Sequence, residues 1–320
     1  MPILISAQTN PYWNVAVENY LVNTPLDGGI PILYLWRNHR TVVIGQNQNP
    51  YAECNLERLL GDGGFLMRRT TGGGAVYHDD GNINFSFVAP PDTYNQGRHY
   101  EVIRKALQSY GLDVELSGRN DLLCQGRKFS GNAFSKGRCN WLHHGTLLIS
   151  GDMADLSLYL KVKPVKLQKH GVQSVRSRVV NLSELAPVTS LNIVPRLVEA
   201  YCEEYHTDAQ QMDFQTVISQ PDVQELYAKF SSDDWLYGRW KHFQATCSAQ
   251  FDWGAIDLQI MVDEQKGIIT DLQLATDALD TDLNTSLRNL LVGATTDHAP
   301  QLPHDHPQFN QLSDILTLIY

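Results

Sequence analysis

The chain has 320 residues, 42% of them hydrophobic and 19% charged, which is ordinary for globular domains with a sizeable core. Its formal net charge of −10 argues against nucleic acid as the main partner, because such proteins usually carry a basic surface. No apolar run approaches the roughly 20 residues of a membrane span, Met1 to Asn10 lacks the blocks of a signal peptide, and the five cysteines include no C-x-x-C pair, so we expect a soluble cytoplasmic protein with free thiols.

Hydrophobic patterns predict a large first domain in which strands and helices alternate unevenly. Short apolar runs bounded by polar residues or glycine indicate strands, and apolar residues at helical spacing indicate helices. The polar stretch 37–40 is expected to turn between the first two strands. The predicted strands are residues 32–36, 41–44, 65–69, 75–78, 83–88, 121–124 and 141–149, and the predicted helices are 55–60, 101–110, 193–205 and 223–230.

The pattern changes after residues 231–240. From Ala249 it predicts three strands, with a turn at 264–267, followed by a helix at 279–291. A loop rich in His and Pro follows at 297–307, and residues 311–320 are expected to form a closing helix. The chain therefore divides into residues 1–240 and a small domain at 241–320, and the fold class is α+β.

A glycine-rich segment carries the first candidate site. Gly72, Gly73 and Gly74 follow two arginines and lie between predicted strands. Glycines let backbone N–H groups approach an anion, and arginines suit phosphate or carboxylate oxygens. The segment is neither a Walker loop nor a dinucleotide fingerprint, because no Gly-Lys-Ser/Thr and no helix follow. A hairpin turn with two solvated arginines is the alternative, and the neighbouring His78 and Asp79 favour a site.

Polar residues at two other places add to this candidate. Alternation puts Asn82, Asn84 and Ser86 on one face of a strand, where they suit a pocket lining, although an edge strand with a wet face has the same pattern. Asp121 opens a later strand and can hold a metal or a ribose hydroxyl. Lys128 follows in a segment bounded by glycine and serine, and a lysine there can neutralise a phosphate and a carboxylate as they combine. A lone lysine is usually a solvated surface charge, so only these neighbours single out Lys128.

Paired histidines and a basic run complete the survey. His143 and His144 are adjacent on a predicted strand and point to opposite faces, so we interpret them as structural or supporting residues and not as ligands of one zinc ion. Residues 161–171 and 174–179 are rich in Lys, Arg and His. This run is by default a solvated loop, and its functional interpretation is a patch that attracts an anionic nucleotide or an acidic acceptor domain.

Together these stretches resemble the lipoate–protein ligases. The most specific are residues 68–79, 118–121, 128–131, 143–148 and 174–179, and their order and spacing agree as well as their letters. The resemblance runs from Trp36 to about Leu291. It implies a mixed-sheet domain of the biotin/lipoate ligase type, akin to the catalytic core of class II aminoacyl-tRNA synthetases, and a small α/β C-terminal domain that closes over the adenylate site.

The resemblance also implies residue roles. It makes Lys128 the catalytic lysine and assigns nucleotide contacts to Asn120, Asp121 and Lys128, with Asp121 as the Mg²⁺ ligand. At Ser135 some family members carry an arginine, so Lys136 or Arg138 would have to replace it in any pyrophosphate contact. The residues expected to bind lipoate or its adenylate are Trp36, Arg69, Gly72, Gly73, Gly74, Val76, His78, Asn82, Ser130, Gly131 and His144.

The implied reaction uses ATP, Mg²⁺ and (R)-lipoate. Lipoate's carboxylate attacks the α-phosphorus and releases pyrophosphate, and the neutral amine of an acceptor lysine then attacks lipoyl-AMP. Lys128 would neutralise charge in the first step and stabilise the oxyanion in the second. The implied acceptors are lipoyl domains of 2-oxoacid dehydrogenase acyltransferase subunits and the glycine cleavage H protein.

Three other functions stay open at this point. An octanoyl or lipoyl transferase of the same fold would use a cysteine thioester, for which Cys124 and Cys139 are candidates, although Cys124 alternates with apolar neighbours. Biotin ligase shares the fold but has a different glycine- and arginine-rich loop. A non-catalytic lipoate-binding protein would have no need of Lys128 and Asp121.

Overall fold

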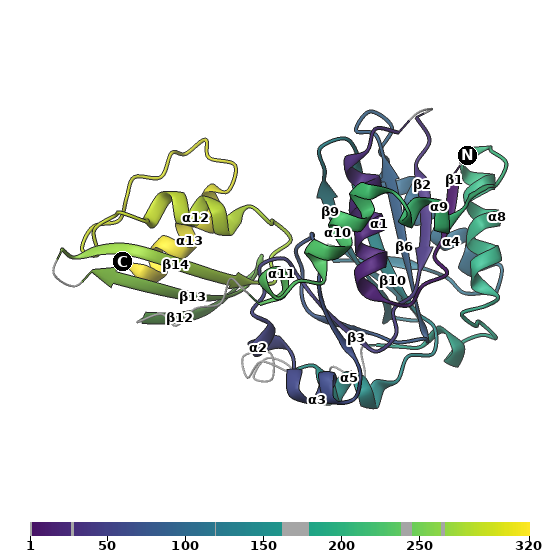
Figure 1. The fold of residues 1–320 in the computed structure, drawn as a ribbon, viewed down its shortest axis with the longest axis horizontal. Helices are drawn as coiled ribbons and strands as arrows, with labels where there is room; N and C mark the ends of the chain where they lie inside the picture. Colours follow the sequence, from purple (N-terminus) through teal and green to yellow (C-terminus); the bar gives the residue numbers. More distant parts are fainter. Residues whose placement is uncertain (1, 27–28, 119, 162–178, 238–244, 264–265) are drawn as a thin grey trace.

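The computed structural model describes residues 2–26, 29–118, 120–161, 179–237, 245–263 and 266–320. They form a large lobe and a small lobe, and the chain leaves the large lobe after the short helix α11 (Asp233–Leu236) (Figure 1). The large lobe is built on an eight-stranded mixed sheet, in which β1 pairs in parallel with both neighbours. From edge to edge its strands are β11 (Gln210–Met212), β1 (Pro2–Ile5), β2 (Ile32–Trp36), β6 (Asn82–Ala89), β10 (Trp141–Leu148), β9 (Arg127–Lys136), β8 (Asp121–Cys124) and β7 (Glu115–Ser117).

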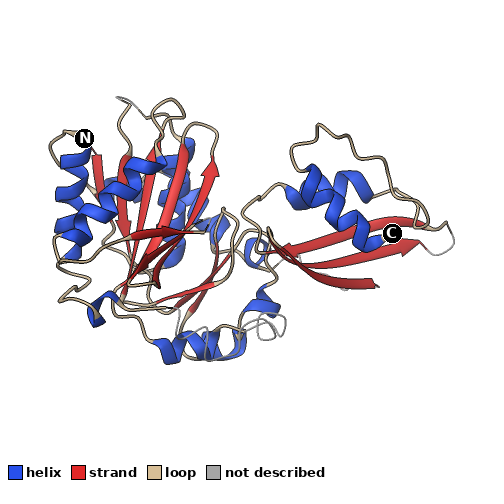
Figure 2. Cartoon of the chain, turned by 180° about the vertical axis from the view of Figure 1, so that it is seen from behind, coloured by secondary structure: helices blue, strands red, loops and turns tan. Residues whose placement is uncertain are grey.

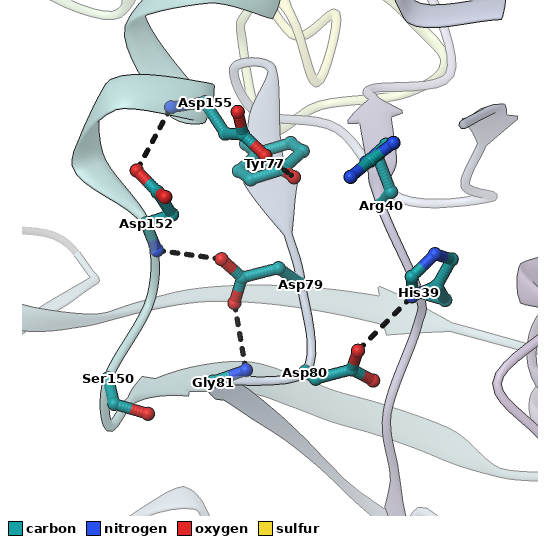
Figure 3. Close-up of a pocket in the computed structure, with 9 residues that line it drawn as sticks. All are labelled: His39, Arg40, Tyr77, Asp79, Asp80, Gly81, Ser150, Asp152 and Asp155. Atoms are coloured by element: carbon teal, nitrogen blue, oxygen red, sulfur yellow. Dashed lines mark hydrogen bonds and ion pairs between the residues drawn. The ribbon is translucent and has the colours of Figure 1, made fainter. Parts of the chain in front are cut away.

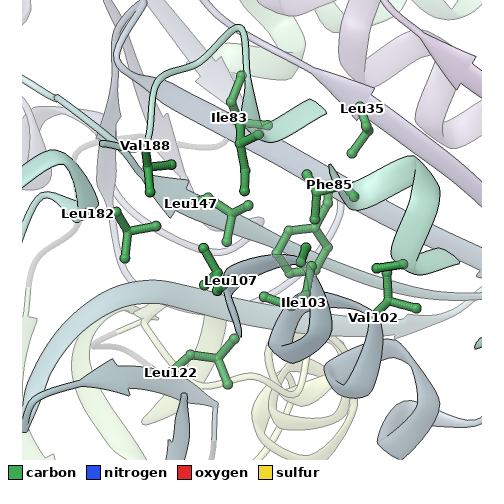
Figure 4. Close-up of a cluster of buried hydrophobic side chains, with 14 of the residues drawn as sticks. Leu35, Ile83, Phe85, Val102, Ile103, Leu107, Leu122, Leu147, Leu182 and Val188 are labelled. Atoms are coloured by element: carbon green, nitrogen blue, oxygen red, sulfur yellow. The ribbon is translucent and has the colours of Figure 1, made fainter. Parts of the chain in front are cut away.

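Helices cover both faces of this sheet (Figures 1 and 2). On one face, α4 (Gln96–Gln108) and α8 (Ile193–Tyr205) pack on alternate apolar residues of the central strands (Figure 4). On the other, α1 (Pro11–Asn23), α9 (Phe214–Ile218) and α10 (Pro221–Phe230) pack on the intervening residues. Each fully buried Leu, Ile or Phe contributes roughly 1.5–3 kcal/mol, so these two clusters dominate the stability of the lobe. Every residue of β6 is buried, which corrects the alternative that this strand is an edge with a wet face.

A second sheet of three strands packs on the face that α1 covers and carries the glycine segment. Its order is β4 (Phe65–Arg68), β3 (Thr41–Ile44), β5 (Val76–His78), so β4 and β5 both pair with β3. The glycine segment therefore crosses over β3 and does not close a hairpin. Residues 37–40 also close no hairpin, because β2 and β3 belong to different sheets. The other short elements of the large lobe are α2 (Pro50–Glu53), α3 (Leu56–Gly61), α5 (Met153–Tyr159) and the 3-10 turn η1 (Leu182–Glu184).

The small lobe is an antiparallel three-stranded sheet with two helices on one face. Its core holds apolar side chains from all five elements, and it is separate from the cores of the large lobe. The expected boundary between residues 240 and 241 lies outside the described residues. The elements are β12 (Ala245–Phe251), β13 (Gly254–Asp263), β14 (Ile268–Thr276), α12 (Leu283–Leu291) and α13 (Phe309–Ile319). None of the described helices is both long and apolar enough to cross a bilayer.

The predicted elements exist, with three instructive differences. Helix α4 begins at Gln96, five residues earlier than expected, because the Asn95 side chain accepts a hydrogen bond from the backbone N–H of Arg98. The segment around Lys128, for which no element was predicted, is part of the ten-residue strand β9. Helix α1 and strand β1 were not predicted at all.

Candidate active site

One face of the eight-stranded sheet carries a patch of polar side chains, most of them buried, beneath the second sheet of the large lobe (β4, β3 and β5). Cross-strand pairing sets Asn84 of β6 opposite Trp36 of β2 on one side and opposite Thr146 of β10 on the other. Directly paired residues share a face, so the predicted row of Asn82, Asn84 and Ser86 is confirmed. The side chains with polar atoms on this face include those of Tyr34, Trp36, Asn82, Asn84, Ser86, His144 and Thr146.

Arg69 shapes the turn that the glycine segment, residues 72–74, forms (the glycine turn). The guanidinium is buried and donates to the carbonyl oxygens of Gly72 (Nη2–O 2.8 Å) and Gly74 (2.9 Å) and to the Thr71 hydroxyl (Nε–Oγ1 3.1 Å). Burial lowers the pKa of Arg69 to about 10, against the opposing charge of Glu18, so it stays protonated at neutral pH. Arg69 therefore fixes the conformation of the turn and brings a positive charge beneath it.

Arg68, unlike the adjacent Arg69, does not contact the glycine turn but binds two other segments of the chain. Its guanidinium is fully buried and donates to the carbonyl oxygens of Gln46, Gln48 and Leu236, at 2.9, 2.7 and 2.7 Å. These contacts tie the loop after β3 to helix α11. The alternative of two solvated arginines is wrong, because both side chains are enclosed by backbone carbonyl groups.

Glu18, a carboxylate that the sequence analysis did not single out, anchors the glycine turn. Glu18 of α1 is 1% exposed, and its two oxygens lie 2.9 and 3.0 Å from Nδ1 of His144. The other ring nitrogen, Nε2, lies 2.9 Å from the Thr71 hydroxyl, which also accepts from Arg69. Glu18 also accepts from Ser86. A continuous hydrogen-bond chain thus runs from helix α1 through the large sheet to the glycine turn.

Trp36 and His78 form the apolar side of the same region. The two rings meet edge to face, with centroids 6.3 Å apart, and the Trp36 indole donates to Ser86 (Nε1–Oγ 3.0 Å). His78 is 3% exposed, and Nε2 of its ring has no hydrogen-bond partner among the described residues. Burial, with the charges of Arg69 and His144, lowers the pKa of His78 to about 3, so its imidazole is neutral. Val76 packs beside Trp36 in the same apolar cluster.

Lys128 reaches the same face from β9. Its ammonium lies 2.7 Å from Asp121 Oδ1, and a Cβ on Gly131 would lie only 3.3 Å from Nζ, so the lysine lies directly over that glycine. Gly131 in turn donates its N–H to Thr146 Oγ1 at 3.3 Å. The Lys128 side chain is 39% exposed and that of Asp121 36%, so the pair lies at the open end of the polar patch. Lys128 therefore does not point away from the sheet into bulk solvent.

Asn120 and Ser130 belong to a different set of contacts. Both meet Asn132: the Asn120 amide donates to its backbone carbonyl, and Ser130 accepts from Asn132 Nδ2 at 3.3 Å. Asn132 Oδ1 lies 2.9 Å from Nε2 of His143, on the face that α4 covers. The Asn120 contacts therefore tie the start of β8 to β9, whereas the Ser130 contact lies within β9. The expectation that His143 and His144 point to opposite faces is confirmed.

The small lobe contacts the glycine turn directly. The N–H of Gly73 donates to the Ala278 carbonyl (3.1 Å), and Asn47 Nδ2 donates to the Thr281 carbonyl (2.9 Å). A Cβ on Gly72 would lie 2.3 Å from the Ala278 oxygen, so only glycine fits there. One amide of the predicted anion nest is therefore bonded to the small lobe in this arrangement.

A cavity of about 400 Å³ beyond His78 has four carboxylates among its nine lining residues (Figure 3). Asp79 there accepts from the backbone N–H groups of Gly81 (2.9 Å) and Asp152 (2.7 Å), which makes it a clip between β6 and α5. Four carboxylates repel a carboxylate or phosphate ligand, so this cavity does not suit an anionic substrate. Its lining residues are His39, Arg40, Tyr77, Asp79, Asp80, Gly81, Ser150, Asp152 and Asp155.

The chemistry at Asp121 fits a magnesium ion bound mainly through a nucleotide. Among the described residues no cluster of three His, Cys, Asp or Glu side chains could hold a metal alone. Mg²⁺ in nucleotide sites commonly takes one or two carboxylates, and phosphates and waters fill its other positions. A single half-exposed carboxylate beside a lysine meets that requirement.

Comparison with known proteins assigns both lobes. Residues 10–202 match the model of the lipoyl protein ligase A/B catalytic domain, and residues 241–299 match the bacterial lipoate protein ligase C-terminus. A lipoate-protein ligase A of Psychrobacter cryohalolentis is 38% identical over 303 residues, which cover 92% of this chain and 88% of the relative.

Solved structures agree with this assignment. Plasmodium falciparum LipL1 in complex with lipoate superposes with a TM-score of 0.82 and 30% identity, covering 100% of this chain and 99% of that one. A bipartite lipoate protein ligase from Thermoplasma acidophilum, from a structural analysis of this ligase and its E2 lipoyl domain, gives a TM-score of 0.65 and 27% identity, covering 76% of this chain and 98% of that one. A lipoate-protein ligase A bound with ATP gives a TM-score of 0.62 and 27% identity, covering 73% of this chain and 97% of that one.

The predicted fold class is confirmed, since the α+β mixed-sheet domain and the small C-terminal domain both have counterparts in these proteins. Biotin ligase is excluded by the family match. The chain belongs to the lipoate–protein ligase A family of enzymes, in the form that carries both the catalytic domain and the C-terminal domain.

Proposed function

We propose that this ligase activates lipoate with ATP as lipoyl-AMP and transfers the lipoyl group to a lysine of a lipoyl domain. One observation carries the residue assignment: a single sheet face holds the Lys128–Asp121 pair, the polar row and the support of the glycine turn. Relatives solved with lipoate and with ATP support both ligands. The Thermoplasma acidophilum relative, which was analysed together with its E2 lipoyl domain, supports the class of acceptor.

Lys128 is the catalytic residue of this proposal. In the first step two anions, the lipoate carboxylate and the α-phosphate, must approach one another, and an ammonium between them lowers their repulsion. Arg69 adds charge beneath the glycine turn, and the amides of Gly72, Gly73 and Gly74 suit phosphate oxygens once the small lobe releases Gly73. Magnesium, held by Asp121 with the phosphates, would supply further charge neutralisation.

In the second step the neutral amine of the acceptor attacks the acyl carbon, and AMP leaves. Lys128 then donates to the oxygen that becomes negative. No enzyme nucleophile is needed, because the mixed anhydride is already activated. Trp36 and Val76, in the apolar cluster beside the turn, suit the wall of a tunnel for the lipoyl chain, and His78, Asn82 and His144 suit its polar end.

The cysteine-dependent transferase is the rival mechanism, and the cysteine positions oppose it. Cys124 is 1% exposed in the core beneath α4, and burial raises the pKa of its thiol, which disfavours a thiolate nucleophile. Cys139 lies in the turn between β9 and β10, where its Sγ contacts the Asn23 carbonyl at 3.0 Å. Neither thiol makes a contact with Lys128 or the glycine turn in the part of the chain that the structure describes.

The acceptors we propose are the lipoyl domains of 2-oxoacid dehydrogenase acyltransferase subunits and the glycine cleavage H protein, and the compartment is the cytoplasm, where unpaired cysteines persist. The basic run that we expect to steer acidic acceptors falls in residues 162–178, outside the described residues.

The test is lipoate-dependent exchange between ATP and pyrophosphate, with mass detection of lipoyl-AMP. Lys128→Ala should lower the exchange rate at least a hundredfold, in line with the loss of one preorganised charge at the reacting group. Lys105→Ala is the matched control: this lysine lies on α4, on the other face of the large sheet, and pairs with Glu203 (2.8 Å) and Glu204 (3.2 Å), so its loss should leave exchange near the parent rate. Equal rates in both variants would refute the assignment.

A further inference from the structure

Helix α1 sends a second buried polar side chain toward the site, one turn before Glu18. Asn14 is 0% exposed, and its orientation is set by its neighbours. Its amide nitrogen lies 2.7 Å from the Arg37 carbonyl oxygen, which can only accept, so this end of the side chain is Nδ2. Its Oδ1 accepts from the hydroxyl groups of Tyr34 (3.1 Å) and Ser6 (2.7 Å).

The orientation of Asn14 fixes that of Asn38. Asn14 Nδ2 also lies 3.0 Å from the Asn38 side chain, and since a donor faces it, that Asn38 atom is the acceptor Oδ1. The other end of the fully buried Asn38 amide is therefore Nδ2, which lies 3.2 Å from Nδ1 of His78.

This chain of contacts determines where the proton of His78 lies. A neutral imidazole has one N–H and one lone pair, and Nδ1 faces a donor. Nδ1 therefore carries the lone pair and Nε2 carries the proton. That Nε2–H is buried and points to no acceptor among the described residues, so its hydrogen bond is unmet.

The surroundings show what kind of group would satisfy this donor. The charged or titratable groups that act on His78 are Arg69 from the glycine turn and His144 from β10, and the Trp36 ring covers it from β2. None of these offers an anion, so the donor is open to an oxygen of a bound ligand. An oxygen of a carboxylate, or of the acyl group derived from it, is the acceptor that the proposed reaction brings here.

We propose that Asn38, held by Asn14, is a positioning residue that keeps His78 as the neutral Nε2–H tautomer, and that His78 donates this hydrogen bond to a carboxyl oxygen of the acyl substrate. The inference rests on the proposed function and adds a defined role within it. His78 transfers no proton: it stabilises the acyl oxygen as charge grows on it during attack by the amine. A neutral donor does this without adding a third cation beside Arg69 and Lys128.

The tautomer is measured first, on the ligand-free protein, by ¹⁵N NMR of histidine-labelled enzyme, with the His78 signals assigned by their absence in His78→Gln. We expect Nδ1 at the chemical shift of an unprotonated ring nitrogen and Nε2 at that of a protonated one. In Asn38→Asp, at a pH of about 9 where imidazolium is scarce, a carboxylate faces Nδ1 and the proton should move to Nδ1. A proton on Nδ1 in the parent would overturn the inference.

The ligand contact is measured next. Addition of lipoate, or of a sulfamoyl analogue of lipoyl-AMP, should shift the Nε2 resonance of the parent. In single-turnover transfer to a lipoyl domain, His78→Leu and Asn38→Asp should each be about a hundredfold slower, whereas His78→Gln, which keeps an N–H at the Nε2 position, should recover at least tenfold over His78→Leu. No Nε2 shift, or equal rates for the Gln and Leu variants, would sink the proposed contact.

Asn140→Asp is the matched control for a buried amide turned into an acid. Asn140 is 1% exposed and donates to the carbonyl oxygens of Leu21 (2.8 Å) and Thr24 (2.7 Å), so the substitution costs stability without touching His78. Its His78 tautomer should stay that of the parent. If Asn140→Asp slows transfer as much as Asn38→Asp, the Asn38 effect is structural. Failure of the proposed function would instead appear as absent exchange of ATP with pyrophosphate in the parent.

Discussion

Removing the Glu18 carboxylate tests whether helix α1 supports the glycine turn. In Glu18→Ala the Ser86 hydroxyl and His144 Nδ1 lose a buried partner, and the protonated Arg69 loses the nearby opposing charge. Each orphaned buried polar group costs about 1–3 kcal/mol, so the loss of a partner for Ser86 and for His144 costs about 2–6 kcal/mol in total. At about 2–4 °C per kcal/mol for a domain of this size, the melting temperature should fall by roughly 10 °C.

The assay combines thermal unfolding, followed by circular dichroism, with ATP–pyrophosphate exchange at a temperature where every variant is folded. Glu18→Gln keeps the shape and one acceptor oxygen for His144, so it should lose only about 1–2 kcal/mol. Glu199→Ala is the control, because this carboxylate is 63% exposed and pairs with the half-exposed Arg196, an interaction that contributes little.

ATP–pyrophosphate exchange should report on the shape of the glycine turn separately from the stability of the protein. Without Glu18, His144 is released from one side, and its contact with Thr71 no longer fixes the turn. We expect a KM for lipoate raised several-fold in folded Glu18→Ala. A melting temperature within about 2 °C of the parent would refute the reasoning, because it would mean that the carboxylate is not the buried anchor that its contacts describe.

Three further predictions test other contacts. Gly72→Ala should displace the small lobe and increase the radius of gyration in small-angle scattering, because its Cβ would lie 2.3 Å from a small-lobe carbonyl, whereas Gly61→Ala, with nothing within 4 Å, should not. Burial first, then the charge of Arg98, lowers the pKa of His99 to about 3 from 6.5, so the unfolded chain gains the proton first as pH falls. The stability that comes from neutral, buried His99 is complete above pH 6.5 and is lost toward pH 3. Between pH 7 and 5 the free energy of unfolding, measured in urea, should fall by about 2 kcal/mol. His99→Gln should remove this pH dependence, whereas His39→Gln, at an exposed position, should not. Asp121→Asn should raise the KM for ATP roughly tenfold, the equivalent of one charge-assisted hydrogen bond, with little change in melting temperature because the pair is half exposed.

The parts of the site that lie on strands could be predicted from the sequence because strand periodicity fixes the face. Alternation alone put Asn82, Asn84 and Ser86 together, and adjacency put His143 and His144 on opposite faces. The role of Arg69 could not be read in this way, because its partners are backbone carbonyl groups that only the folded turn brings around it.

Helix α1 was missed for a physical reason. A surface helix is recognised by an apolar stripe, but on this helix Asn14 and Glu18 occupy buried positions, at 0% and 1% exposure. Polar residues at buried positions erase the pattern on which prediction depends. The usable signal was their spacing, since residues four apart lie on one helix face.

The spacing of Asn14 and Glu18 also explains why one helix supports both His78 and the glycine turn. Asn14 reaches His78 through Asn38, and Glu18 reaches the glycine turn through His144. Burying either side chain without partners would cost several kcal/mol, so each is tolerated only because its hydrogen bonds are met in the folded arrangement. The two chains of contacts start one helical turn apart, and any shift of α1 along its axis would break both together. The helix therefore couples the position of the His78 donor to the shape of the turn, which is what a site that aligns two anions requires.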